Sequence, residues 1–228
     1  MKANWGVVIV AAGRGTRMET KESKQYLQLA DKPIVVHTLE LFQELADVTE
    51  IVLVVGEDDV ERCRAWTMQY GLTKVTAVVA GGAERQQSVH IGVQAVSTEW
   101  VMVHDGVRPL ISSSAVKACC SAAEECGAAV LAVPVKDTIK QVNSAGVITA
   151  TPDRRSLWSI QTPQAFRRSL LLEGHERAAA EGFLGTDDAM VVERLGAAVM
   201  VAEGEYTNIK ITTPEDLPYA EFLMAARK

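Results

Sequence analysis

Five short, almost entirely apolar segments rich in β-branched residues recur along this chain of 228 residues, separated by stretches of helical length. Strands that are apolar on both faces are typical of parallel sheets covered by helices on both sides. The expected strands are residues 7–10, 51–55, 75–79, 100–103 and 128–133. This alternation of strand and helix predicts an α/β protein with a doubly wound sheet and right-handed crossovers.

The segments between these strands carry the signals of α-helices. Pro33 can occupy a first-turn position, where its missing N–H costs nothing, and Ser112 and its two following serines offer N-caps. We expect helices at residues 33–45, 58–70, 84–96, 113–126 and about 168–181, and a last helix from residue 214. We also expect a strand near residues 197–202 and a strand-like segment at residues 208–211.

The rhythm of strands and helices breaks after Pro134. Residues 135–159 are polar and extended in character, and the alternation around Asn143-Ser144-Ala145-Gly146 predicts a β-hairpin with a short loop. The hairpin has too few apolar residues for a core of its own, and an isolated hairpin is marginally stable in water. We therefore expect one domain over residues 1–228, with an arm at about residues 135–159 that projects and packs against a second subunit.

The composition excludes several classes of protein. The net charge of −6 leaves no general basic surface for a nucleic acid. No apolar run approaches the roughly 20 residues of a membrane helix, and we find no signal peptide. The four cysteines lack C-x-x-C spacing, and the adjacent Cys119 and Cys120 fit buried thiols of a reducing compartment. We expect a cytoplasmic protein that binds neither nucleic acid nor membrane.

A glycine-rich loop follows the first expected strand. Gly13 and Gly15 let the backbone approach an anion closely and present N–H groups to it. The same loop carries four cations: Arg14, Arg17, Lys21 and Lys24. Nucleotidyl transfer needs such charges around the reacting phosphorus. The loop lacks the third glycine of a dinucleotide fingerprint and the spacing of a P-loop, so a solvated basic turn stays open as the alternative.

A second glycine pair, Gly81-Gly82, follows the third expected strand and opens a helix. A glycine turn against a helix N-terminus can bind an anion, and its backbone groups can contact the edge of a nucleobase. The alternative is structural: Glu84 is a favourable carboxylate for the first turn of that helix. The segment itself favours neither interpretation.

The fourth expected strand ends in a polar segment, at the sheet edge where ligands of open α/β sheets bind. Asp105 can bind Mg²⁺ together with substrate phosphates, and Arg108 can pair with a phosphate. The alternative is an ion pair between Asp105 and Arg108 that braces the turn. His104 is expected to pack rather than to catalyse. Lys210 is a further candidate, because a lysine inside a strand-like segment is rarely buried without a partner.

Taken together, these residues resemble the family of 2-C-methyl-D-erythritol 4-phosphate cytidylyltransferases. The glycine-rich loop alone is shared by nucleotidyltransferases in general, whereas the later blocks are specific in their order and spacing. The matching blocks are residues 11–18, 24–26, 81–89, 103–105, 108–109, 134–138, 161–164, 186–188, 208–210 and 214–217.

The resemblance implies an enzyme that transfers CMP from CTP to 2-C-methyl-D-erythritol 4-phosphate. The products would be 4-diphosphocytidyl-2-C-methyl-D-erythritol and pyrophosphate, in the synthesis of isoprenoid precursors. The resemblance also implies a Rossmann-like, mostly parallel sheet, Mg²⁺ as cofactor, and a homodimer whose arms interlock.

The resemblance further assigns roles to individual residues. The implied catalytic residues are Arg17 and Lys24, which would neutralise the triphosphate, and Arg154 and Lys210, which would position the acceptor. The implied CTP-binding residues are Ala11, Ala12, Gly13, Gly15, Gly81, Gly82, Ala83, Arg85 and Ser88. The acceptor would contact Asp105, Arg108, Thr138, Thr162 and Thr186, some of them from the neighbouring subunit, and Asp105 would also bind the Mg²⁺.

Two positions depart from the family pattern. Ser23 stands where a proline is expected before Lys24, which predicts a more mobile lysine loop. Thr207 stands where some members carry an acidic residue, which questions a second metal or sugar contact.

Three other functions compete with this interpretation. A ribitol-5-phosphate cytidylyltransferase would differ only in its acceptor pocket, and a sugar-1-phosphate nucleotidyltransferase would use another nucleotide. A non-catalytic nucleotide sensor could share the fold. Against the sensor, the chain retains four groups that stabilise transferred charge: Arg17, Lys24, Asp105 and Lys210.

Overall fold

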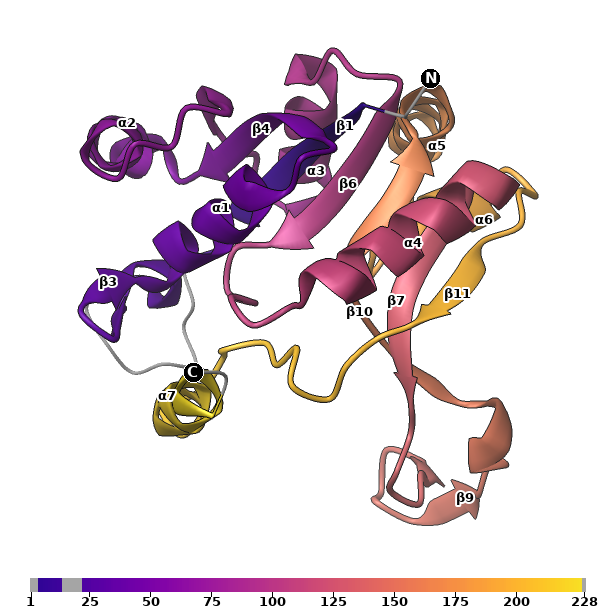
Figure 1. Cartoon of the computed structure of the whole chain (residues 1–228). Helices are drawn as coiled ribbons and strands as arrows, with labels where there is room; N and C mark the ends of the chain where they lie inside the picture. Colours follow the sequence, from indigo (N-terminus) through magenta and orange to yellow (C-terminus); the bar gives the residue numbers. More distant parts are fainter. Residues whose placement is uncertain (1–3, 14–21, 227–228) are drawn as a thin grey trace.

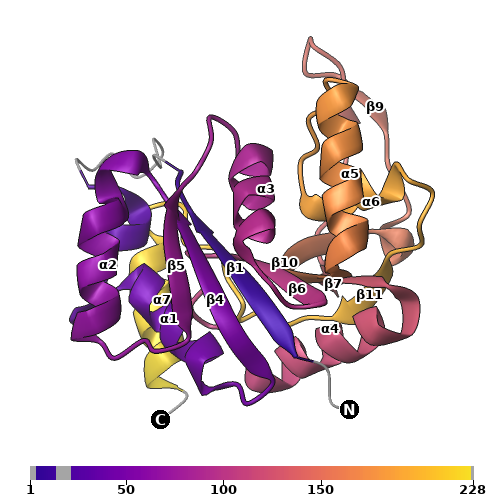
Figure 2. The same cartoon turned by 90° about the horizontal axis from the view of Figure 1, so that it is seen from above.

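A seven-stranded sheet forms the centre of the computed structural model, which describes residues 4–13 and 22–226 (Figures 1 and 2). Its strands, in spatial order, are β11 (Met200–Glu203), β7 (Ala128–Pro134), β10 (Trp158–Arg167), β6 (Trp100–Asp105), β1 (Trp5–Ala11), β4 (Val48–Val55) and β5 (Val75–Ala80). Neighbouring strands are parallel except where β10 pairs with β6 and β7. The mostly parallel, Rossmann-like α/β sheet is thereby confirmed.

Helices cover both faces of the sheet (Figure 2). One face carries α1 (Ile34–Glu44), α2 (Val60–Gln69) and α4 (Ser113–Cys126), and the other carries α3 (Arg85–Ala95), α5 (Arg168–Ala180) and α6 (Asp188–Glu193). The last helix, α7 (Asp216–Ala225), packs beside the short strands β2 (Gln28–Leu29) and β3 (Lys32–Pro33). Among the described residues, short 3₁₀ turns occur at η2 (Lys24–Tyr26), η3 (Glu57–Asp59) and η4 (Arg154–Ser156).

The serine cap predicted for the fourth helix is confirmed. The Ser112 hydroxyl accepts a hydrogen bond from the Ala115 N–H at the start of α4. Gly127, which was not predicted as a cap, ends that helix with a φ of 90°. Pro33 lies at the N-cap of α1 instead of in its first turn. The predicted helices agree with the structure to within one or two residues at most ends, and the predicted strand at 197–202 begins three residues later.

A glycine brings helix α3 close to the sheet. A Cβ atom at Gly92 would lie 2.4 Å from Cγ1 of Val8 on β1 and 2.9 Å from Cγ2 of Val54 on β4. Interiors packed this tightly leave no room for an added methyl group. The close approach places the N-terminus of α3 beside the loop that follows β1.

Two expectations about the second half of the chain were wrong. Strand β10 was not predicted, because its centre is polar and contains Pro163, so that residues 161–164 look like a turn. Residues 208–211 form no strand; they run as an irregular segment in which Asn208 and Ile211 are buried and the Ile211 N–H donates to the Val107 carbonyl. The Asn208 N–H donates to the Glu205 carbonyl, and the Asn208 carbonyl accepts from Nη1 of Arg108, in place of the hydrogen bonds of a strand.

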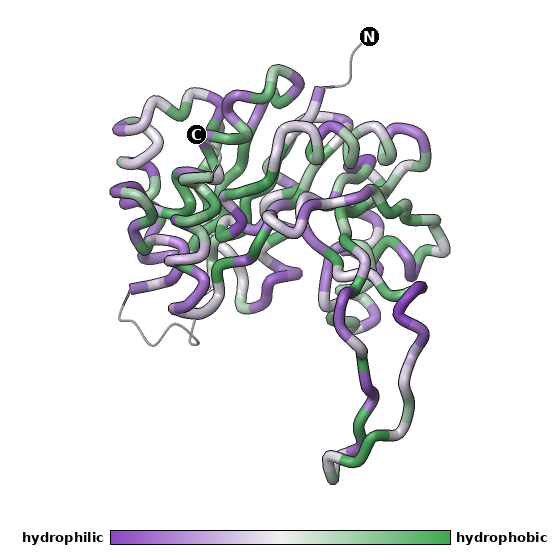
Figure 3. Tube along the Cα trace, turned by 60° about the horizontal axis from the view of Figure 1, so that its bottom comes forward, coloured by the Kyte–Doolittle hydropathy of each residue, from purple (hydrophilic) through white to green (hydrophobic). Residues whose placement is uncertain are grey.

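The segment between β7 and β10 leaves the body of the protein as an arm (Figures 1 and 3). Its strands β8 (Gln141–Val142) and β9 (Ile148–Ala150) pair as the predicted antiparallel hairpin. The turn is held by Asn143, whose side-chain oxygen accepts from the N–H groups of Ala145 and Val147. The arm covers residues 135–157, because Trp158 and Ser159 already pair with β7.

The structure also bears on the expectations about membrane helices and cysteines. Within the described residues, no helix combines the length and the apolarity needed to cross a membrane. Cys120, which was also expected to be buried, is only partly buried. Cys63 and Cys119 are buried thiols, and burial raises the pKa of the Cys119 thiol to about 12. These thiols are therefore protonated parts of the core.

Two stacked histidines join helices α3 and α5. The rings of His90 and His175 lie 5.3 Å apart with an interplanar angle of 9°, and neither Nε2 atom has a hydrogen-bond partner among the described residues. Burial lowers the pKa of His175 to about 4, and the charges of His90 and Arg85 add to the effect. His175 is therefore neutral near pH 7, and its protonation favours the unfolded chain.

The burial of His175 predicts that the folded protein loses stability as the pH falls. The folded pKa of His175 lies below its unfolded value, so its contribution is complete above about pH 6.5 and declines as the pH falls toward about 4. Replacing His175 by phenylalanine keeps the stack and removes this titration. Between pH 7 and pH 5, urea unfolding of His175→Phe should lose about 1 to 2 kcal/mol less stability than the wild type. Parallel pH profiles for the two proteins would contradict the assignment.

Candidate active site

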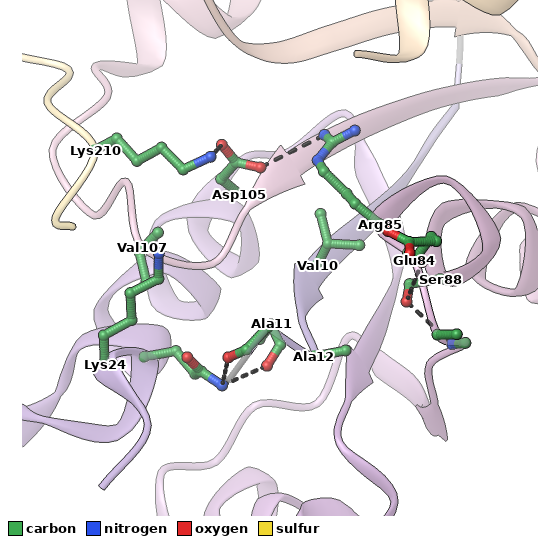
Figure 4. A pocket seen from close by; sticks show the side chains of 14 residues that line it. Val10, Ala11, Ala12, Lys24, Glu84, Arg85, Ser88, Asp105, Val107 and Lys210 are labelled. Atoms are coloured by element: carbon green, nitrogen blue, oxygen red, sulfur yellow. Dashed lines mark hydrogen bonds and ion pairs between the residues drawn. The ribbon is translucent and has the colours of Figure 1, made fainter. Parts of the chain in front are cut away.

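A cavity of about 170 Å³ opens at the carboxyl ends of β1 and β6 (Figure 4). Its walls come from the loop after β1, the η2 turn, the N-terminus of α3 and the segment before α7. Ten of the predicted residues line it: Ala11, Ala12, Gly13, Lys24, Gly82, Ala83, Arg85, Ser88, Asp105 and Lys210. Seven of the nine predicted CTP-binding residues thus line one cavity; Gly81 does not line it, and Gly15 lies outside the described residues.

A second cavity, of about 280 Å³, adjoins the first on the side of β10. Its predicted lining residues are Arg85, Asp105, Arg108, Thr162, Thr186 and Lys210. Three of these, Arg85, Asp105 and Lys210, line both cavities. A ligand in one cavity therefore meets a ligand in the other at these three side chains.

Asp105 lies at the centre of this junction and faces three cations. Lys210 Nζ is 2.9 Å from its Oδ2 atom, and Arg85 and Arg108 each approach to 3.5 Å. Figure 4 shows Lys210 and Arg85 reaching the carboxylate from opposite sides. Burial by itself would raise the pKa of Asp105, but the three cations outweigh burial and hold that pKa well below its ordinary value. Asp105 is therefore ionised at neutral pH.

The segment before α7 is fixed from within by Asn208, which is fully buried. Its side-chain nitrogen donates to Oε1 of Gln161 at 3.0 Å and to the carbonyl of Thr162 at 2.9 Å. Its own carbonyl accepts from Nη1 of Arg108 at 2.8 Å. These bonds hold Lys210, two residues later, in reach of Asp105. The sequence block 208–210 was recognised, but no role for Asn208 was predicted.

His104 is a structural residue, as expected. Burial lowers its pKa to about 4, so the ring is neutral. With the proton on Nε2, the ring donates to the Arg108 carbonyl at 3.1 Å, and Nδ1 accepts from the Thr162 hydroxyl at 3.1 Å. The same hydroxyl accepts from the Asp105 N–H at 3.0 Å. Thr162 thereby fixes the backbone of Asp105. A direct contact between Thr162 and the acceptor substrate stays a prediction.

Gln25 ties the loop after β1 to the turn that carries Lys24. Its buried amide nitrogen donates to the carbonyls of Ala11 at 2.7 Å and Gly13 at 3.1 Å. Ser23, just before this turn, has a φ of −65°, which is the value that a proline would impose. Serine therefore keeps the backbone shape of the turn. Gln25 was missed, because nothing in its type distinguishes it from a surface glutamine.

The glycine pair before α3 allows two loops to meet. A Cβ atom at Gly81 would lie 2.7 Å from that of Ala12 and 2.6 Å from the Ser88 hydroxyl. The Ser88 hydroxyl accepts from the Gly82 N–H and donates to the Glu84 carbonyl. Glu84 is the N-cap of the helix and forms a capping box with Gln87, one position earlier than the first-turn role considered above.

Two of the predicted site residues lie on the arm, away from both cavities. Thr138 and Arg154 are on the arm and exposed, and Nη1 of Arg154 donates to the Lys136 carbonyl. They therefore take no part in the cleft of their own chain. Gly15 and Arg17 lie outside the described residues, as do Arg14 and Lys21.

Asp105 is the predicted metal ligand, and it lines both cavities. The described residues contain no group of three or more histidine, cysteine or acidic side chains that could hold one. Asp105 offers a single hard oxygen donor, so any cation there would need further ligands from a bound phosphate. Mg²⁺ is commonly bound in this way, by one or two carboxylates with substrate phosphates.

Comparison with known proteins gives one consistent result. The family model for 2-C-methyl-D-erythritol 4-phosphate cytidylyltransferase matches residues 6–226. A relative of that name from Alkaliphilus oremlandii is 47% identical over 225 residues, covering 97% of this chain and 95% of the relative. One from Bacillus velezensis is 49% identical over 222 residues, covering 96% and 95%.

Solved structures agree with the sequence comparison. A 4-diphosphocytidyl-2C-methyl-D-erythritol synthase from Anaerococcus prevotii has a TM-score of 0.86 to this chain at 30% identity. The match covers 99% of this chain and 100% of that one. The similarity therefore extends over the sheet, the cleft and the arm together.

Proposed function

This chain belongs to the 2-C-methyl-D-erythritol 4-phosphate cytidylyltransferase family, and from that membership we propose the reaction of its cleft. The protein transfers CMP from CTP to 2-C-methyl-D-erythritol 4-phosphate. The products are 4-diphosphocytidyl-2-C-methyl-D-erythritol and pyrophosphate, and the reaction belongs to isoprenoid precursor synthesis. We assign the whole chain to one nucleotidyltransferase domain with its arm.

The observation that carries the proposal is the pair of adjoining cavities with three shared residues. CTP would occupy the cavity beside the glycine pair and α3, and the acceptor would occupy the cavity beside β10. The α-phosphate would then lie at the junction, near Arg85, Asp105 and Lys210. Holding two reactants in contact in this way removes much of the entropic barrier to their reaction.

The transfer needs no nucleophile from the protein. An oxygen of the acceptor phosphate attacks the α-phosphorus of CTP and forms the new P–O bond. The bond from the α-phosphorus to the bridging oxygen breaks, and pyrophosphate leaves with the electron pair. Negative charge shifts onto the leaving group during this step, so fixed cations stabilise the transition state. Lys24 and Lys210, which line the CTP cavity, are proposed to do so together with Arg17.

Mg²⁺ is the proposed cofactor, with Asp105 as its protein ligand. The ion would neutralise charge on the triphosphate when bound. Asp105 is ionised and already pairs with cationic side chains. A metal ion could therefore replace one of these side chains at its carboxylate.

We also propose a homodimer in which each arm reaches the neighbouring subunit. Four aliphatic side chains of the arm are exposed in the single chain: Ile139, Val142, Val147 and Ile148. A hairpin that exposes aliphatic side chains in this way gains stability when these side chains are buried against a partner. Arg154 and Thr138 would then enter the partner's cleft, which accounts for their distance from the cleft of their own chain. A cytoplasmic location stays a prediction from the sequence.

The test of the reaction is the choice of acceptor. Ribitol 5-phosphate is not favoured, because the family model and the relatives carry the methylerythritol name. With CTP and Mg²⁺, we expect pyrophosphate release with 2-C-methyl-D-erythritol 4-phosphate to exceed that with ribitol 5-phosphate by at least about 100-fold in kcat/KM. The same assay with UTP and a hexose 1-phosphate should give no turnover. Faster release with ribitol 5-phosphate would contradict the proposed acceptor.

The dimer predicts complementation between two inactive variants. Lys24→Ala removes a cation from a chain's own cleft, whereas Arg154→Ala removes one from its partner's cleft. After subunit exchange of an equal mixture, half of the dimers are mixed, and one cleft in each carries neither change. Activity should recover to about a quarter of the wild-type value. A mixture no more active than its components, or a monomer by light scattering, would contradict the arrangement.

A further inference from the structure

Asp188, the first residue of α6, is a buried carboxylate that the reaction described above does not use. Its side chain is 1% exposed. Its two oxygens accept hydrogen bonds from Arg85, at 3.0 Å from Nη1 and 2.8 Å from Nη2. Such a two-point contact fixes the plane of a guanidinium group as well as its position.

Arg85 connects this carboxylate to the junction of the two cavities. The same Nη2 atom that bonds Asp188 lies 3.5 Å from Oδ1 of Asp105. Arg85 is therefore shared unequally between two acids, and the shorter contacts go to Asp188. With Arg108 and Lys210, the junction contains three cations and two carboxylates. Without the charge of Asp188, three cations would face Asp105 alone.

The position of Asp188 is set independently of Arg85. Gln164 on β10 is buried, and its Oε1 atom accepts from the N–H groups of Asp188 at 3.1 Å and Ala189 at 3.0 Å. Its Nε2 atom donates to Asp187, which caps α6. Gln164 of the sheet thus fixes the start of α6. Asp188, held in place there, orients the side chain of Arg85.

The two charges depend on each other. Burial raises the pKa of Asp188, and the charge of Arg85 opposes that rise. Burial would lower the pKa of Arg85, but Asp188 first and Asp105 second outweigh it. Arg85 therefore loses its main partner when the charge of Asp188 is removed, and Asp105 is the nearest replacement.

We propose that Asp188 is a positioning residue for the transfer: it holds the Arg85 guanidinium at the junction and keeps Asp105 available to Lys210 and a cation. The proposal rests on the proposed function. When Asp188 is neutral, Arg85 closes on Asp105 and withdraws it from the reacting phosphates. The loss should then fall on the transfer step more than on CTP binding.

Asp188→Asn tests this role, because it removes the charge and keeps the size and the backbone bonds to Gln164. We expect kcat to fall at least tenfold, and the Kd for CTP from calorimetry to change by less than about threefold. The matched control is Glu50→Gln, which neutralises another buried carboxylate at the opposite end of the sheet, where Glu50 accepts from Ser97 and Thr98. Its kcat should stay within about twofold of the wild type.

A double variant separates positioning from stability. If Asp188 acts through Arg85, Asp188→Asn combined with Arg85→Gln has the kcat of Arg85→Gln alone. A further tenfold loss in the double variant, or a wild-type kcat in Asp188→Asn, overturns the proposal. If Asp188→Asn alone does not fold, the double variant still decides the question, because it buries no unpaired charge. An inactive wild type would contradict the proposed function instead, so the two failures are distinguishable.

Discussion

The rest of the site depends on the interaction between the buried carboxylate of Asp105 and the three cations around it. A buried charge is stable only when other charges and hydrogen bonds compensate its lost hydration. Here the compensation comes from Arg85 at the start of α3, Arg108 after β6 and Lys210 before α7. Three separate parts of the chain are thus drawn to one edge of the sheet, and the two ligand cavities meet where they converge.

Neutral hydrogen bonds fix the geometry of these charges. The His104 ring and the Thr162 hydroxyl hold the backbone at the end of β6, while Asn208 holds the segment that carries Lys210. Gln164 does the same for α6 and, through it, for Asp188. The charged groups are therefore preorganised by buried polar side chains, so that little reorganisation accompanies the development of charge.

The sequence predicted the parts of the fold that rest on local patterns. Apolar runs located six of the seven sheet strands, and the serine cap marks the start of α4 as observed. It could not predict β10, whose polar centre around Thr162 is explained only by partners distant in the chain, nor the irregular course of Asn208. The three charged residues that line both cavities, Arg85, Asp105 and Lys210, were among the predicted site residues. No role was predicted for Gln25 or Asp188, because their roles depend on what they contact.

A crystal structure of the protein with CTP and Mg²⁺ would show where the reacting phosphate binds. We expect the α-phosphate at the junction of the two cavities, with an oxygen in hydrogen-bonding distance of Lys210 Nζ and the metal ion on Asp105. Cytosine should lie beside Gly81 and Ser88. A triphosphate bound away from the junction, with Lys210 still paired to a metal-free Asp105, would rule out this arrangement of the site.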